Sequence, residues 1–169
     1  FFRQGNNWRL AVGDWSAGYF VPVRDLAERI QALQIRRDSG DSRYVWLSSK
    51  EKPEGTTSGA PVHFAASHRL EQGSAIITEG ALKADVIAHF SESAVVGLAG
   101  VNSYKPSFGS ALKVAGVRSV QIAFDADWQK NYAVRKGIER LGTLLSDADL
   151  KVSLLNWALS EGKGLDDLL

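Results

Sequence analysis

The sequence predicts an α/β protein with two lobes: a small, mainly β lobe over residues 1–70 and a parallel sheet covered by helices over residues 71–169. Two observations predict this organisation. Between residues 8 and 65, short apolar stretches alternate with turn-rich segments, which is typical of strands. After residue 73, runs of four to six apolar or β-branched residues are each followed by a helical stretch, which is typical of a parallel sheet with helices on both faces.

In the first lobe, five apolar stretches are expected to be strands. The link over residues 24–29 is short enough for a hairpin with a polar tip, and the polar residues 48–61, rich in Gly and Pro, predict a mobile loop. The boundary between the lobes is expected at residues 66–73. The expected strands are WRLAV (8–12), GYFVPV (18–23), IQALQIR (30–36), YVWL (44–47) and PVHFA (61–65).

In the second lobe, strands and helices are expected to alternate along the chain. The expected strands are AIIT (75–78), AVVGL (94–98), VQIAF (120–124) and KVSLLNW (151–157), and the expected helices cover residues 81–90, 107–115 and 130–147. Parallel sheets place their ligands beyond the carboxyl ends of the strands, so residues at those ends are the first candidates for a site.

The charge, cysteine content and hydropathy of the sequence limit the kinds of protein that it can be. The net charge is +1. Residues 1–70 contain 10 Lys and Arg and 7 Asp and Glu, whereas residues 71–169 contain 10 Lys and Arg and 12 Asp and Glu. This difference suits a mildly basic lobe beside a lobe that holds cations. The absence of cysteine excludes disulfides and thiolate metal sites and is consistent with the cytoplasm. No apolar run approaches the roughly 18–20 residues of a membrane span and no signal peptide is present, so no membrane partner is expected. A start at Phe1, without methionine, is expected of an excised domain or of a chain from which a tag was cleaved.

Three carboxylates are predicted at strand ends. Glu79 follows the strand at 75–78, and Asp125 and Asp127 follow the strand at 120–124. Because side chains in a strand alternate with a period of two, Asp125 and Asp127 are expected to face the same point. An alternative is that the two aspartates cap a helix beginning near Trp128.

A divalent cation resolves the repulsion that three clustered carboxylates would otherwise have. Ligation by oxygen alone favours Mg²⁺ or Mn²⁺ over zinc, and Mg²⁺ commonly binds one or two carboxylates together with substrate phosphates. Gly80 leaves room for a ligand near the backbone, and the positive end of the helix at 81–90 suits phosphate oxygens.

The segments IITEGALKADVIAHF and AFDADW, whose first acidic residues are separated by 46 positions, resemble the Toprim domain of bacterial-type primases, topoisomerases and some nucleases. The resemblance implies a Rossmann-like parallel sheet in which Glu79, Asp125 and Asp127 bind divalent metal beside phosphodiester chemistry. Upstream, GYFVPVRDLAERIQALQIRRD and RYVWLSS are similar to the segment that precedes Toprim in bacterial-type primases. The resemblance is closest to the Toprim-like domain of primase-helicase-like proteins of phages, plasmids and mobile elements, which is often described as a domain of unknown function. Three further motifs support it: WLSS, TSG-x-P and the terminal W…GKGLDDLL.

The resemblance implies the core of a primase-like nucleotidyltransferase that takes part in DNA replication, with single-stranded DNA template and nucleoside triphosphates as partners. No zinc-binding module or helicase motor is recognised in the sequence, so a helicase domain or other replication proteins are expected to supply template recognition and unwinding. A Toprim nuclease is an alternative, and so is a nucleic-acid or nucleotide binding module without catalysis.

Lys83 marks a departure from the family pattern, because bacterial-type primases often have an aspartate at this position. Lys83 is therefore a candidate for a phosphate contact in catalysis, with a solvated helix lysine as the alternative. Asp85, two residues later, is rotated about 200° around the helix from that position.

Further candidates are basic and aromatic. Arg24, Arg36 and Arg37 are expected on or beside the hairpin, where guanidinium groups could bind phosphates, although Arg37 could instead pair with Asp38 or Asp41. Trp128 is a candidate for stacking on bases, whereas Trp46 is expected in the core.

The remaining candidates lie in loops and at the C-terminus. Lys50 and Lys52 lend charge to the loop at 48–61, which could fold over a triphosphate but is more typical of a solvated linker. Asp166 and Asp167 could return toward the metal site or lie on the exposed face of a C-terminal helix. The three histidines, His63, His68 and His89, have no spacing typical of metal ligands and are expected to be structural.

Overall fold

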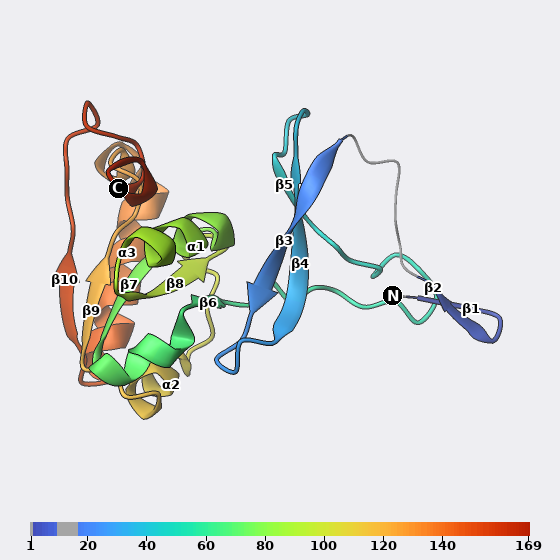
Figure 1. Cartoon of the computed structure of the whole chain (residues 1–169), viewed down its shortest axis with the longest axis horizontal. Helices are drawn as coiled ribbons and strands as arrows, with labels where there is room; N and C mark the ends of the chain where they lie inside the picture. The colour runs from blue at the N-terminus through green and yellow to red at the C-terminus, as the bar shows by residue number, and fades with distance from the viewer. Residues whose placement is uncertain (1, 10–16) are drawn as a thin grey trace. The chain divides into compact units, whose positions relative to one another are not determined.

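The structure, a computed structural model, describes residues 2–9 and 17–169 in two compact units (Figure 1). One unit contains the described residues up to Val23 together with Ile30–Pro61, and the other contains Arg24–Arg29 and Val62–Leu169. Part of the strand predicted at 8–12 lies outside the described residues. Each unit is considered by itself.

Strands dominate the first unit, and strands and helices alternate in the second. The strands are β1 (Phe2–Gln4), β2 (Asn7–Arg9), β3 (Gly18–Arg24), β4 (Ile30–Arg37), β5 (Tyr44–Trp46), β6 (His63–Ala65), β7 (Ser74–Glu79), β8 (Ala94–Leu98), β9 (Ser119–Ile122) and β10 (Lys151–Leu154). The helices are α1 (Ala81–Phe90), α2 (Phe108–Val114) and α3 (Tyr132–Asp147), with short 3₁₀ helices at Ser67–Gln72, Trp128–Lys130 and Leu165–Asp167.

The first unit contains a three-stranded sheet in the order β3-β4-β5 and a separate pair of strands, β1 and β2. β4 and β5 are antiparallel, with Arg36 opposite Tyr44 and Gln34 opposite Trp46. The buried apolar side chains of this unit include Val21. The segment over 48–61 has no strand or helix, as the density of Gly, Pro and polar residues predicted.

The second unit is built on a five-stranded sheet in the order β10-β9-β7-β8-β6. β7 is parallel to both β8 and β9, and β9 is parallel to β10, whereas β6 joins the edge antiparallel to β8. β6 corresponds to PVHFA, which the sequence analysis grouped with the strands of the first lobe. The predicted α/β class with a mostly parallel sheet is confirmed.

Two apolar clusters cover the two faces of this sheet. One cluster joins Ile77 of β7 to α2 and α3 through side chains such as Leu112 and Leu141. The other joins Ile76, the preceding residue of β7, to α1 through Ile87. Because successive residues of a strand face opposite sides, a doubly apolar strand requires helices on both faces, and the structure places them there.

The order in which successive strands are added to the sheet reverses at the boundary between β7 and β9. β7 continues into α1 and then to β8 on one side, whereas β9 continues into α3 and then to β10 on the other side. The two helices lie on opposite faces, so the carboxyl ends of β7 and β9 flank a topological switch point. Open α/β sheets bind their ligands in the crevice at such a point.

Among the described residues, no helix combines the length and the apolar character that crossing a membrane requires.

Candidate functional site

Glu79 is the last residue of β7 and is half-buried at the switch point. Burial, followed by the negative charge of Asp125, raises the pKa of the Glu79 carboxyl, while the charges of Lys83 and Lys163 act in the opposite direction. Gly80 follows with φ 86° and ψ 145°, a conformation that side chains rarely allow, and this turn lets α1 begin at Ala81. The Glu-Gly pair thus places a carboxylate at the carboxyl end of the central strand β7, directly before the N-terminus of α1.

Asp125 follows β9 by three residues and is engaged by two lysines. Lys83 Nζ, from the first turn of α1, donates a hydrogen bond to Asp125 Oδ1, and Lys163 Nζ lies 3.3 Å from Asp125 Oδ2. Hydrogen bonding to Asp125 is the main reason that the pKa of the Lys163 ammonium is raised. These two ion pairs neutralise part of the negative charge that the sequence predicts at the strand ends.

Neither aspartate caps the helix that follows. Asp127 precedes the 3₁₀ helix at Trp128–Lys130 but its side chain makes no capping hydrogen bond, and α3 is capped by Asn131, whose Oδ1 accepts from Ala133 N–H (3.0 Å) and Val134 N–H (3.3 Å). The capping alternative is therefore wrong.

The carboxylates of Glu79 and Asp127 have no hydrogen bond or ion pair with another group in the part of the chain that the structure describes. Two carboxylates without a protein partner among the described residues, at the carboxyl ends of parallel strands, form a donor set that fits a hard divalent cation. Within residues 2–9 and 17–169, no group of three or more His, Cys, Asp or Glu side chains is arranged to hold a metal ion. The third carboxylate, Asp125, is the one that the lysines engage.

The C-terminal segment lies against the site. Ala126 N–H, between the two aspartates, donates to the carbonyl of Lys163 (2.7 Å). Asp167 Oδ2 accepts from Lys163 N–H and Gly164 N–H, each at 2.9 Å, and these bonds hold its pKa below the ordinary value. Asp166 Oδ1 is buried and has no hydrogen-bond partner among the described atoms. The predicted C-terminal helix is reduced to the 3₁₀ turn at Leu165–Asp167.

Lys163 was missed by sequence reasoning. It lies 38 positions from Asp125, in a segment without regular secondary structure, so no periodicity predicts the pairing. The available signal was the two flanking glycines in GKGLDD, which allow a close passage of backbone. A Cβ on Gly164 would lie 3.1 Å from Lys83 Nζ and 2.1 Å from Asp166 Oδ1.

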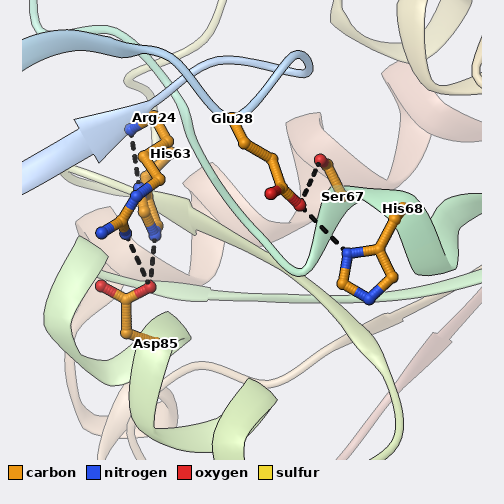
Figure 2. Close-up of polar contacts among 6 residues, drawn as sticks. All are labelled: Arg24, Glu28, His63, Ser67, His68 and Asp85. Atoms are coloured by element: carbon orange, nitrogen blue, oxygen red, sulfur yellow. Dashed lines mark hydrogen bonds and ion pairs between the residues drawn. The ribbon is translucent and has the colours of Figure 1, made fainter.

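Arg24, a predicted phosphate contact, lies in a partly buried polar network (Figure 2). Its guanidinium pairs with Asp85 (3.4 Å), and its backbone N–H donates to His63 Nδ1 (3.0 Å). His63 is 1% exposed, and its Nε2 lies 3.1 Å from Asp85 Oδ1. Because Nδ1 accepts a hydrogen bond, the proton of a neutral His63 resides on Nε2 and is donated to Asp85. Asp85 therefore faces Arg24 and His63, and the expected structural role of His63 agrees with these contacts.

Glu28 joins the 3₁₀ helix at Ser67–Gln72 (Figure 2). Its Oε1 accepts from the Ser67 hydroxyl (3.2 Å) and lies 3.0 Å from His68 Nδ1. The hydrogen bond from His68 is the main reason that the pKa of Glu28 is lowered. His89 stacks edge-on against Phe90 at the end of α1.

In the first unit, Arg36 lies in a row of aromatic side chains. Its guanidinium carbon is 5.7 Å from the centroid of the Tyr19 ring, and Tyr44 is its direct partner on β5. Tyr19 is 46% exposed and Tyr44 43% exposed, so both rings reach solvent. The sequence analysis named Arg36 but neither tyrosine. Arg37 is half-buried and follows Arg36 on β4.

The remaining residues that the sequence predicts to bind nucleic acid or nucleotide lie in both units. Lys50 is exposed and forms an ion pair with Glu51 (3.6 Å), and Lys52 is exposed. Trp46 is half-buried on β5. Trp128 packs against the apolar cluster of α2 and α3, and its buried Nε1–H has no hydrogen-bond partner among the described atoms.

The family model described as Domain of unknown function (DUF3854) matches residues 69–169. No curated protein matches the chain.

Solved structures of primases are similar in fold. The Aquifex aeolicus primase (zinc-binding and RNA polymerase domains) is 20% identical with a TM-score of 0.65 over 89% of this chain and 36% of its own. A DnaG primase catalytic domain bound to single-stranded DNA is 15% identical with a TM-score of 0.66 over 92% of this chain and 48% of its own. The primase fragment of the bacteriophage T7 primase-helicase protein is 17% identical with a TM-score of 0.55 over 88% of this chain and 56% of its own. The chain thus has the Toprim-like fold of primase cores and spans well under two thirds of each of these chains.

Proposed function

We propose that this chain, which belongs to the family described as Domain of unknown function (DUF3854), is the catalytic core of a primase-like nucleotidyltransferase that acts on a nucleic-acid template. One observation supports the proposal most directly. Glu79 ends β7, and Asp125 and Asp127 follow β9. These two strands flank the switch point, where α/β sheets bind ligands, in a fold similar to primase cores.

The acidic residues would hold Mg²⁺ or Mn²⁺. The carboxylates of Glu79 and Asp127 have no hydrogen bond or ion pair among the described residues, whereas both oxygens of Asp125 are engaged by lysines. When bound, such an ion supplies charge stabilisation to triphosphate oxygens and lowers the pKa of an attacking hydroxyl. The pKa of the Glu79 carboxyl is raised first by burial and then by the negative charge of Asp125, and a cation would relieve the second of these effects.

The lysines and the start of α1 would bind the phosphates. Lys83 and Lys163 bring two ammonium groups to the acidic residues. Each ammonium has three N–H donors and uses one of them on Asp125, so two remain with which it can bridge Asp125 to a phosphate oxygen. Gly80 has open space where a side chain would lie, which leaves the first amides of α1 accessible to an anion.

The first unit would bind the template strand. Arg36 offers a guanidinium for phosphate, and the exposed rings of Tyr19 and Tyr44 beside it offer stacking surfaces for bases. Arg37 and the exposed Lys50 add charge that favours a polyanion. One structural neighbour was solved bound to single-stranded DNA, which supports the choice of template. Arg24, paired with Asp85, would position α1 rather than contact phosphate.

The proposed context is replication of a phage, plasmid or other mobile element, with a helicase domain or replication proteins as partners. The bacteriophage T7 primase-helicase neighbour supports a helicase partner, because there a primase fragment of similar fold belongs to a primase-helicase protein.

A primer-synthesis assay tests the proposal. The chain is incubated with single-stranded DNA, nucleoside triphosphates and Mn²⁺, and products longer than one nucleotide are measured for wild type and for Asp127→Asn. We expect synthesis by the wild type and a loss of at least about a hundredfold in the variant, because removing one electrostatic group from such sites costs this much. Asp147→Asn, an exposed aspartate at the end of α3, is the matched control and should retain full activity.

The same assay separates the alternatives. Cleavage of DNA in the absence of nucleotides indicates a Toprim nuclease and contradicts the synthetic role. Binding of nucleotide and template without any turnover, even at high Mn²⁺, indicates a binding module. The observation that favours the binding module is the engagement of Asp125 by Lys83 and Lys163.

A further inference from the structure

Asp125 is held between ammonium groups from two distant segments. Lys83 is the third residue of α1, and Lys163 lies in the C-terminal segment after β10. Lys83 Nζ donates to Oδ1 and Lys163 Nζ lies 3.3 Å from Oδ2, so each carboxylate oxygen has its own cation. Such an arrangement leaves little of the Asp125 carboxylate for a metal ion.

The backbone around Lys163 is fixed. Its carbonyl accepts from Ala126 N–H (2.7 Å) and its N–H donates to Asp167 Oδ2 (2.9 Å). Trp157, earlier in the same segment, packs against the apolar cluster of α1 and donates its Nε1–H to the carbonyl of Gly162 (3.0 Å). Lys163 is therefore presented to the acidic residues by an anchored segment, unlike a lysine on a free surface loop.

Lys83 is confined by the same segment. A Cβ on Gly164 would lie 3.1 Å from Lys83 Nζ, so the backbone of the C-terminal segment passes directly beside the ammonium. The buried Oδ1 of Asp166, which lacks a hydrogen-bond partner among the described atoms, lies beside the same point of Gly164. The C-terminal segment thus brings both a cation and an anion to the site.

Charge counting limits how many metal ions the site holds. Glu79, Asp125 and Asp127 have three negative charges when ionised, and Lys83 and Lys163 neutralise two of them. Asp166, which the C-terminal segment brings beside Lys83, adds a fourth negative charge when ionised, so a single divalent cation makes the group neutral. A second divalent cation would lie within a few Å of two ammonium groups, where repulsion between like charges is strong.

We propose that Lys83 and Lys163 take the place of a second divalent cation, so that the site binds one Mg²⁺ or Mn²⁺ through Glu79 and Asp127. Two-metal sites use a pair of cations to clamp the attacking and leaving oxygens of a phosphoryl transfer. Here the two ammonium groups on Asp125 supply the second set of positive charges. This inference rests on the proposed function, because it assumes that the acidic residues bind a divalent cation.

Counting bound Mn²⁺ tests the inference without any measurement of activity. Mn²⁺ is titrated into the chain by calorimetry, and the free ion is counted in parallel by its electron paramagnetic resonance signal. We expect one ion per wild-type chain and two ions for Lys83→Gln/Lys163→Gln, because that double variant exposes the Asp125 carboxylate. Lys83→Arg/Lys163→Arg keeps both charges and should bind one ion, so two ions on this variant would overturn the inference even if the glutamine variant does not fold.

The matched control is Lys113→Gln/Lys151→Gln. It removes the same charge from exposed lysines, one of which forms an ion pair with Asp149, outside the acidic site. The control should bind one ion, as the wild type does. Two ions on the wild-type chain, or one ion on a folded Lys83→Gln/Lys163→Gln variant, would overturn the inference.

The outcomes also separate this inference from the proposed function. Two ions on a wild-type chain that synthesises primers overturn only the inference. One ion on a chain that binds nucleotide but never extends a primer upholds the inference and overturns the proposed catalysis. No bound ion on the wild type overturns both the inference and the metal-dependent part of the proposed function.

Discussion

At the scale of single residues, Gly80 determines how Glu79 meets the helix that follows. Its φ of 86° with ψ of 145° is accessible to glycine and strained for other residues. The neighbouring strand β8 also has a glycine beside this turn. A Cβ on Gly97 would lie 2.6 Å from the Gly80 carbonyl oxygen, so the close approach requires glycine there as well. Two glycines therefore shape the turn at the end of β7.

Gly80→Ala should lower the free energy of unfolding by about 1–3 kcal/mol, the usual cost of one residue held in a sparsely populated backbone region. No atom lies within 4 Å of the new Cβ, so the loss comes from the backbone alone. Chemical denaturation measures it. Gly142→Ala in α3 is the control: its Cβ also meets nothing within 4 Å, but its helical backbone predicts a gain of about 0.5–1 kcal/mol. Equal effects of the two changes would contradict this explanation.

Asp167 gives a prediction about pH. Its pKa is lowered from 3.8 chiefly because its carboxylate accepts the Gly164 and Lys163 N–H groups. A lowered pKa in the folded state means that the stabilisation is fully present above pH 3.8 and is lost as the pH falls through the folded-state pKa. Asp167→Asn should therefore unfold at a lower temperature than the wild type at pH 7, and the difference should shrink below pH 3.8.

The amide resonances of Lys163 and Gly164 provide a direct readout for Asp167. In the wild type they should titrate with a midpoint below 3.8, and in Asp167→Asn this titration should disappear. A midpoint at or above 3.8 would show that the carboxylate does not hold the C-terminal segment.

At the scale of elements, α3 is positioned by a cap rather than by the acidic residues before it. Asn131 Oδ1 accepts two of the first backbone N–H groups of the helix, which leaves Asp127 free of this role. The sequence offers Asp125, Asp127 and Asn131 within seven residues, and all are good capping residues, so spacing alone cannot decide among them.

Asn131→Ala should cost about 0.5–2 kcal/mol of stability, the range measured for loss of a capping side chain. Asn131→Asp, which retains an acceptor oxygen at the cap, should cost less. Thermal or chemical unfolding compares the two variants. If Asp127→Ala were more damaging to stability than Asn131→Ala, the assignment of the cap would be wrong.

At the scale of the whole molecule, the predicted alternation of strands and helices is confirmed in the second unit, where each predicted strand and helix has a counterpart. Doubly apolar runs such as AVVGL signal burial on both faces, and this signal is local in the sequence. β6 was grouped with the first lobe because a short apolar run does not reveal its pairing partner. Its partner, β8, lies about thirty residues later in the chain.

The acidic site was predictable only in part, for the same reason. Strand ends predicted where Glu79, Asp125 and Asp127 would meet, since parallel strands bring their carboxyl ends to one edge. Their partners are set by contacts between distant segments: Lys163 reaches Asp125 from the C-terminal segment, and Asp85 turns toward Arg24. No local pattern encodes those pairings.

The central claim is that this edge of the sheet binds a divalent cation, and a calorimetric titration of Mg²⁺ or Mn²⁺ tests it most directly. Wild type is compared with Glu79→Gln/Asp127→Asn, with and without nucleoside triphosphate, and with Glu92→Gln/Asp147→Asn as a control for the change of charge. We predict binding by the wild type and the control, tightened by the nucleotide, and no binding by the Glu79→Gln/Asp127→Asn variant. Equal metal binding by all three proteins would contradict the claim.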